Sequence, residues 1–166
     1  VLKYGSGNSM IIVLGNPEKA AEEYYSARVL SKGNKCWSPD GAIVLKDLKD
    51  AFFNRLVDLD NQNQENWPRY NSRSIGEIIA LAKMWGKVAH GHYGMSNNSL
   101  GLLIYDGLNS SSPYFEKEVT FPAAGIITVN CYQEAIDCAN QIILRRGASA
   151  YLSLGYFGPD EYCQPI

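Results

Sequence analysis

The sequence predicts a single α+β domain over residues 1–166, with a mostly antiparallel sheet, about four helices and two disulfides. Its length of 166 residues is that of one domain with a substantial core. Hydrophobic residues make up 46% of the chain and charged residues 19%, which is a globular composition. Helical stripes of apolar residues alternate with short runs rich in β-branched and aromatic residues, so helices and strands are expected in the same fold.

The first half of the chain contains one expected strand and three expected helices. Residues 10–14 form an apolar strand-like run, and Asn16 followed by Pro17 predicts the start of a helix that continues to about Leu30. The triplet at 38–40, Ser-Pro-Asp, predicts a second helix by the same cap-and-proline pattern. Its expected apolar face carries Leu45, Leu48, Phe52, Leu56 and Leu59.

A third helix and the remaining strands follow from similar signals. Ser74 and Glu77 form a capping box ahead of an apolar stripe that ends near Ala89. Residues 100–105 and 115–129 are typical of strands, with an interruption expected at Pro122. A clean helical face begins at Tyr132, and residues 150–157 predict a final strand.

Four cysteines, Cys36, Cys131, Cys138 and Cys163, lack the paired spacing of a zinc site. An even count favours disulfides. Because Cys131 and Cys138 are expected on one helix, about 10 Å apart, they cannot pair with each other. Two connectivities remain: Cys36 with Cys131 and Cys138 with Cys163, or Cys36 with Cys138 and Cys131 with Cys163. Four free thiols in an intracellular protein are the alternative.

Charge and hydropathy exclude some partners and suggest a location. A net charge of -2 and a pI near 5.7 leave no electrostatic footprint for nucleic acid. No apolar run reaches the roughly 20 residues that span a bilayer. The chain begins at Val1, so a signal segment is expected to have been removed, and sequons at Asn97 and Asn109 suit a secreted glycoprotein. The expected partner is an unidentified target protein or cell-surface component.

The most distinctive chemical feature is a pair of carboxylates, Glu116 and Glu118, in the segment Phe-Glu-Lys-Glu-Val-Thr-Phe-Pro at 115–122. Residues two apart on a strand share a face, where like charges can raise one pKa and stabilise positive charge on a sugar carbon. An ordinary amphipathic strand with a solvated acidic face has the same pattern. Both interpretations are open from the sequence.

This segment resembles the E-x-E-V-x-x-P strand of the arginine-specific mono-ADP-ribosyltransferases, with the Ser-Arg-Ser at 72–74 and Arg28 in a similar order upstream. The resemblance implies a secreted toxin or effector enzyme that transfers ADP-ribose from NAD to a protein. In that interpretation Glu118 is catalytic, Glu116 assists it, Ser72 supports the nicotinamide site and Arg28 contacts the NAD phosphates. NAD is then a substrate, and no bound cofactor is expected.

A second hypothesis is a non-catalytic secreted protein that binds a cell surface, because the expected cysteine-stapled units are similar in fold to fungal killer-toxin-like proteins. The two histidines, His90 and His92, have no third ligand nearby in the sequence, so no metal is expected. Ser74 has a simpler role as the cap of the third helix.

Overall fold

The computed structural model describes residues 8–31, 38–91, 93–94, 97–146 and 151–159. Its centre is a five-stranded sheet in the order β5-β6-β2-β1-β7, and every neighbouring pair is parallel. The strands are β1 (Asn8–Val13), β2 (Pro39–Leu45), β5 (Leu103–Leu108), β6 (Ala123–Val129) and β7 (Tyr151–Phe157). The predicted antiparallel α+β arrangement is therefore wrong, and the fold is α/β.

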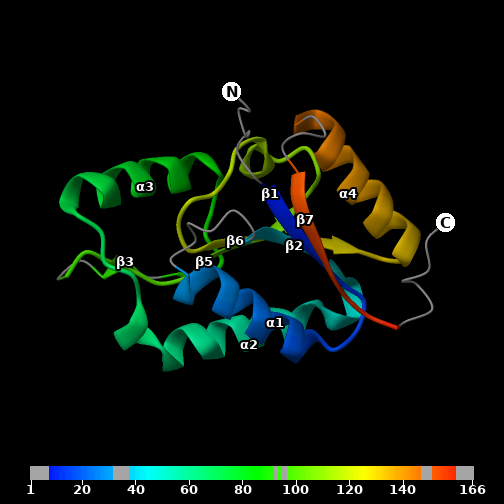
Figure 1. The fold of residues 1–166 in the computed structure, drawn as a ribbon, viewed down its shortest axis with the longest axis horizontal. Helices are drawn as coiled ribbons and strands as arrows, with labels where there is room; N and C mark the ends of the chain where they lie inside the picture. Colours follow the sequence, from blue (N-terminus) through cyan, green and yellow to red (C-terminus); the bar gives the residue numbers. More distant parts are fainter. Residues whose placement is uncertain (1–7, 32–37, 92, 95–96, 147–150, 160–166) are drawn as a thin grey trace.

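Helices cover both faces of this sheet (Figure 1). On one face lie α1 (Pro17–Tyr25), which continues into the π-helical turn η1 (Ser26–Leu30), and α2 (Lys46–Gln62). On the other lie α3 (Ser72–Met84) and α4 (Tyr132–Arg146). Short 3-10 turns, η2 (Gln64–Asn66) and η3 (Pro113–Glu116), and a small hairpin of β3 (Tyr93–Gly94) with β4 (Ser99–Leu100) complete the described elements.

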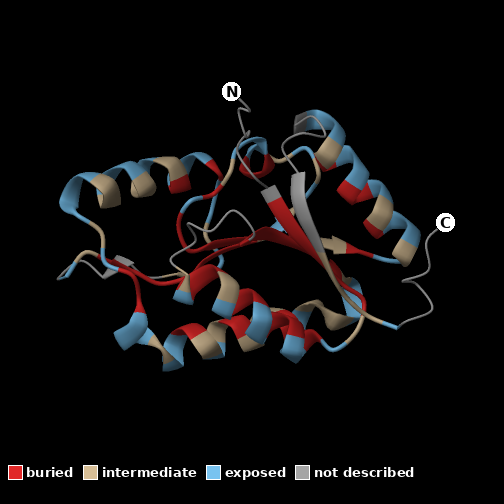
Figure 2. Cartoon of the chain, viewed as in Figure 1, coloured by how far each residue is buried: buried red, intermediate tan, exposed pale blue. Residues whose placement is uncertain are grey.

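The sheet separates two hydrophobic cores, because successive side chains of a strand point to opposite faces. In β1, Met10 and Ile12 pack toward α3 and α4, whereas Ile11 and Val13 pack toward α1 and α2. The central strands are consequently buried along their length (Figure 2). A strand buried on both faces reads as a continuous apolar run and not as an alternation.

Burial of the central strands on both faces explains the largest error in the predicted elements. Residues 39–45 form the central strand β2, not the start of a helix, and the second helix begins only at Lys46. The apolar helical stripe begins at Leu45, the last residue of β2, so strand and helix merge into one pattern in the sequence. Because residues 39–45 read as the start of a helix, the sequence does not show the repeated strand-helix-strand order that predicts a parallel sheet.

Most of the other long elements agree with the sequence analysis, but residues 115–122 are not part of a strand, because β6 begins only at Ala123. The first strand, the helix starting at Pro17, the third helix, the helix from Tyr132 and the final strand are confirmed, with small shifts at their ends. The third helix, however, is capped by Asn71, whose side chain accepts a hydrogen bond from the Ser74 amide at 2.8 Å. The expected cap, Ser74, lies inside the helix. Within the described part of the chain, no helix combines the length and apolar character needed to cross a membrane.

The two predicted disulfide patterns are also wrong. Cys131 and Cys138 are both free thiols, and each connectivity required both of them to be bonded. Cys36 and Cys163 lie outside the described residues. Cys131 is exposed just before α4, whereas Cys138 belongs to α4 and is buried in the core, where burial raises the pKa of its thiol to about 11 and Glu134 adds to the shift.

Candidate functional site

A buried ion pair joins Arg28 of η1 to Asp40, the second residue of strand β2. The Nη1 atom of Arg28 lies 3.0 Å from Oδ1 of Asp40, and the two side chains are only 1% and 2% exposed. Charged side chains are almost never buried to this extent unless they are paired and hydrogen-bonded. Removing one partner of such a pair typically costs about 3–5 kcal/mol.

Arg28 uses its remaining nitrogens on the backbone ahead of β6. Its Nε donates to the carbonyl oxygen of Ala123 at 3.1 Å, and its Nη2 donates to the carbonyl oxygen of Val119. These two carbonyls flank the turn that contains Pro122, which has no N–H of its own. The guanidinium therefore holds the backbone at the point where the chain enters β6.

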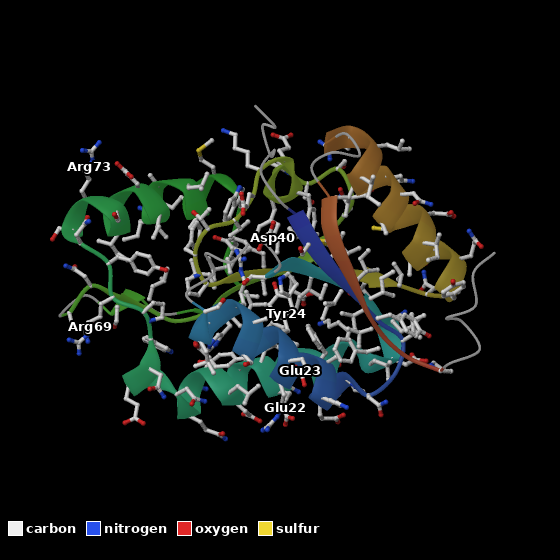
Figure 3. The ribbon with its side chains drawn as sticks, in the orientation of Figure 1. Glu22, Glu23, Tyr24, Asp40, Arg69 and Arg73 are labelled. Carbon is white, nitrogen blue, oxygen red and sulfur yellow. The ribbon has the colours of Figure 1, made fainter. Side chains whose placement is uncertain are left out.

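Two buried tyrosines complete this polar centre, which we call the Arg28–Asp40 hub. Tyr24 on α1 lies within hydrogen-bonding distance of the carbonyl oxygens of Asp40 (2.9 Å) and Ala123 (3.2 Å), and Tyr114 on η3 donates to Asp40 at 2.7 Å. Burial raises the pKa of both phenols well above the ordinary range. Both hydroxyls thus remain protonated donors. Figure 3 shows Tyr24 and Asp40 at the centre of the molecule, with Glu22 and Glu23 on the outer side of α1.

The hub holds residues 117–122, the segment that connects η3 to β6, and this segment contains one of the two predicted acidic residues. It is not the predicted strand: β6 begins only at Ala123. Glu116 is exposed at the end of η3, where Nη2 of Arg145 donates to it at 3.3 Å. Glu118 is half-buried and directly precedes Val119. Since neither lies on a strand, the argument that places both carboxylates on one strand face does not apply.

The other two predicted binding residues lie apart from each other. Arg28 is buried, and its nitrogens contact Asp40 and backbone carbonyls. Ser72 is exposed at the start of α3, where its hydroxyl accepts a hydrogen bond from Asn98 at 3.3 Å. Arg73 lies at the outer end of α3 and Arg69 lies beside the β3–β4 hairpin, both away from the hub (Figure 3).

On the side of segment 117–122 that faces α3, aromatic packing replaces the polar contacts. The ring of Phe121 stacks on that of Trp85, which also meets Tyr114 edge-on with centroids 4.8 Å apart. Beside this stack a cavity of about 320 Å³ separates the segment from α3. Its lining residues are Tyr70, Ser74, Glu77, Ile78, Leu81, Thr120 and Phe121. The wall is thus aromatic and aliphatic, with hydroxyl and carboxylate groups among it.

A second cavity, of about 340 Å³, lies between the carboxyl ends of β5 and β6 and helix α4. Its acidic side chains already make hydrogen bonds. Glu134 accepts one from the backbone N–H of Asn130 at 2.6 Å, and Asp137 accepts one from the side-chain amide of Gln133 at 3.0 Å. The first cavity is the stronger candidate site, because the segment forming its wall is held by a buried charged hub. A cavity left by ordinary side-chain packing would not require a buried ion pair behind its wall.

His90 does not line this cavity: its Nε2 lies 3.0 Å from the buried carboxylate of Asp60 on α2. His92 lies outside the described residues. The described residues contain no group of three histidine, cysteine or acidic side chains able to hold a metal ion.

Known proteins share both sequence and fold with this chain, although no family model matches it. Over 151 residues it is 28% identical to the 1-pyrroline-5-carboxylate dehydrogenases of Staphylococcus epidermidis and Staphylococcus aureus, covering 81% of this chain and 29% of those proteins. An NAD-dependent aldehyde dehydrogenase from Sinorhizobium meliloti superposes over 93% of this chain and 33% of its own, with a TM-score of 0.71 and 17% identity. A salicylaldehyde dehydrogenase from Pseudomonas putida G7 covers 92% and 38%, with a TM-score of 0.70 and 22% identity.

The chain has the fold of a part of these aldehyde dehydrogenases. It spans less than a third of the length of the curated relatives. The similarity contradicts the predictions of an ADP-ribosyltransferase, of a killer-toxin-like protein, and of a secreted toxin or effector glycoprotein. It also corrects the role expected for NAD, which serves the structural neighbours as the cofactor of a dehydrogenase and not as an ADP-ribose donor.

Sequence reasoning missed three hub residues, Tyr24, Asp40 and Tyr114. For Asp40 a signal was present: an acidic residue stands at the head of the apolar run 41–45, and a buried charge of this kind needs a partner. The run was assigned to a helix, in which an acidic residue in the first turn is ordinary. The tyrosines carried no signal that separates them from other core aromatics.

Proposed function

We propose that this chain forms part of an NAD-dependent dehydrogenase that oxidises an aldehyde or semialdehyde to a carboxylic acid. The observation that supports this most strongly is the 28% identity to 1-pyrroline-5-carboxylate dehydrogenases over 81% of the chain, together with the shared parallel fold. The candidate site lies in the matched fold, where the buried hub holds the wall of the cavity.

The reaction requires a nucleophile, because an aldehyde carbon releases hydride readily only after an anion has added to it. A thiolate suits this role, since it adds to the carbonyl carbon and leaves a thioester once the hydride has departed. Water then cleaves the thioester, which returns the thiol and releases the acid. NAD, when bound, supplies the acceptor of the hydride. Within this chain, the candidate nucleophile is therefore a reactive cysteine close to the cavity.

Of the four cysteines, Cys36 is our candidate nucleophile, because Cys163, which is also outside the described residues, is not flanked by hub residues in the sequence. Cys138 is disfavoured because its thiol is buried and its pKa is raised to about 11, and Cys131 is exposed at the opposite, carboxyl edge of the sheet. Cys36 lies outside the described residues, so we use only its position in the sequence, between Arg28 and Asp40. Those two residues are the ion pair of the hub, so both flanks of the stretch containing Cys36 are tied to the candidate site.

The described residues fit one end of NAD but not the whole molecule. The cavity beside segment 117–122 offers Phe121 and Tyr70 to an aromatic ring, and Ser74, Glu77 and Thr120 to the hydroxyls of a sugar. A pyrophosphate prefers free N–H groups at a helix N-terminus. Each helix that follows a strand carboxyl end has an acidic first turn instead, at Glu18 in α1, Asp47 in α2 and Glu134 in α4. The pyrophosphate would need residues other than those described.

The proposal is tested by following NADH formation with 1-pyrroline-5-carboxylate and with salicylaldehyde as alternative substrates. We expect activity with the wild-type chain, loss of activity by about 10³-fold or more in Cys36→Ser, and little change in the matched control Cys131→Ser. Equal activity of wild type and Cys36→Ser would contradict the assignment of the nucleophile. Absence of NADH formation by the wild-type chain with both substrates would contradict catalysis by this chain alone, and absence of NAD binding as well would contradict the proposed function.

A further inference from the structure

The contacts of Arg28 do more than neutralise Asp40. A salt bridge alone needs one edge of a guanidinium, yet Arg28 directs Nε and Nη2 to the carbonyls of Ala123 and Val119, on either side of the turn before β6. A planar fork with donors in fixed directions can join three acceptors in this way. The side chain is 1% exposed, so water does not compete for these acceptors.

Segment 117–122 is thus clamped from two sides. Arg28 holds its backbone at Val119 from the α1 side, and Trp85 stacks on Phe121 from the α3 side. Between these anchors Thr120 is exposed and lines the cavity. Glu118, immediately before the first anchor, is half-buried. The positions of Glu118 and Thr120 are therefore set by whatever holds Val119.

We infer that Arg28 is a positioning residue: through its bond to Val119 it places Thr120 at the cavity where the nicotinamide end of NAD binds. This inference rests on the proposed function for the identity of the ligand. The inference that Arg28 positions the segment rests only on the contacts of Arg28. The chemical class recognised there is a ribosylated ring, because the hydroxyls of Thr120 and Ser74 and the carboxylate of Glu77 line the cavity and all accept hydrogen bonds from sugar hydroxyls.

The decisive variant is Arg28→Lys. A lysine ammonium keeps the charge opposite Asp40, but as a point charge on a flexible stem it does not bridge two carbonyls in fixed directions. Arg55→Lys is the matched control, because Arg55 makes a comparable two-nitrogen contact with Glu22 on the surface of α1 and α2, far from the segment. A second variant, Arg28→Met with Asp40→Asn, removes both charges together and so avoids an unpaired buried ion.

Two measurements are made on each variant whose Tm shows that it is folded. The first is the rate of tryptic cleavage after Lys117, an exposed residue inside the segment, identified by mass spectrometry. The second is the affinity for NAD, followed by tryptophan fluorescence, for which Trp85 stacked on Phe121 is the reporter. Cleavage of a locally opened segment reports the population of its open form.

We expect Arg28→Lys to raise the cleavage rate after Lys117 by about tenfold and to weaken NAD binding by a similar factor, with Tm and the Arg55→Lys control little changed. The double variant should behave like Arg28→Lys, because it also lacks the fork. Unchanged cleavage and unchanged affinity in a folded Arg28 variant would overturn the inference. If wild-type protein does not bind NAD, the proposed ligand is wrong, and the cleavage rates alone decide whether Arg28 positions the segment.

Discussion

The indole of Trp85 and the phenyl ring of Phe121 stack with their centroids 5.5 Å apart and their planes inclined by 14°. Trp85 follows the last residue of α3, and Phe121 precedes β6. The same indole meets Tyr105 of β5 edge-on at 5.7 Å, and the hydroxyl of Tyr105 donates to the carbonyl of Ala82 in α3 at 2.9 Å. One aromatic group thus joins a helix, the sheet and the wall of the cavity.

Trp85→Ala should therefore destabilise the protein and loosen the cavity wall together. Truncating a large buried aromatic residue costs about 3–5 kcal/mol, which is measured as a loss in the free energy of unfolding in urea. Met84→Ala is the control: Met84 is the neighbouring residue, but it is 76% exposed, and its truncation should change stability by less than about 0.5 kcal/mol. Equal losses in both variants would show that the stack does not anchor α3.

Two glycines make room for the aromatic residues of η3. Gly41 of β2 and Gly125 of β6 are register partners on neighbouring strands. A Cβ on Gly125 would lie 2.6 Å from the Tyr114 ring, and one on Gly41 would lie 2.8 Å from both the Phe115 ring and the Gly125 carbonyl oxygen. The rings of Tyr114 and Phe115 can pack this closely against the sheet only because neither strand carries a side chain at these two positions.

Gly125→Ala should accordingly cost about 1–3 kcal/mol of unfolding free energy, because an added methyl group overpacks a filled site. Gly76→Ala is the opposite case. Gly76 lies within α3 with no atom within 4 Å of an added Cβ, so alanine there should stabilise the protein by about 0.5–1 kcal/mol. Denaturant titration of the two variants gives the signs, and a stabilising Gly125→Ala would refute the close packing of Tyr114.

The helices were predictable because their apolar stripes and start signals are local. Pro17 marks the first helix, and the stripe from Tyr132 marks the last, independently of what each packs against. The sheet was not predictable in the same way. Whether residues 39–45 form a strand depends on burial between β1 and β6, a property of distant parts of the chain. The same holds for the hub, since Arg28 contacts both Asp40 and Val119, which are 79 positions apart in the sequence.

The acidic pair illustrates how a short motif misleads. Glu116 and Glu118 matched a strand motif two residues apart, but the 3-10 turn η3 ends at Glu116 and Pro122 delays the strand to Ala123. Pro113 at the start of η3 and the proline at 122 were visible in the sequence as turn signals. Their effect on the face of each carboxylate required the backbone of the whole segment.

A second buried carboxylate offers an independent test of the fold. Asp60, which is fully buried at the end of α2, accepts a hydrogen bond from the Leu102 amide at 2.9 Å and lies 3.0 Å from Nε2 of His90. Asp60→Asn keeps an acceptor for the Leu102 amide but replaces the carboxylate oxygen that faces His90 by an amide nitrogen, so the contact with the His90 ring is weakened. We expect a loss of about 1–3 kcal/mol in urea unfolding. Asp58→Asn, on the exposed side of the same helix, should be nearly neutral.

Cys138 should react with a thiol reagent in a strongly pH-dependent way. Burial raises the pKa of its thiol from 9.0 to about 11, so only a small fraction is thiolate near neutral pH. Its alkylation by iodoacetamide, quantified by mass spectrometry, should be slow at pH 7 and rise about tenfold per pH unit up to pH 9. Cys131 is the internal control, because it is exposed and should be labelled faster at pH 7.

The same thiol should affect stability in the alkaline range. Because the raised pKa keeps Cys138 protonated in the folded state while the unfolded thiol ionises near its ordinary pKa of 9.0, the folded state binds more protons above that pH. Its contribution is therefore fully present below pH 9 and is lost progressively as the pH rises toward about 11. Cys138→Ala should flatten the decline in unfolding free energy measured across this interval. A decline identical to that of the wild-type protein would mean that Cys138 is not buried as a neutral thiol.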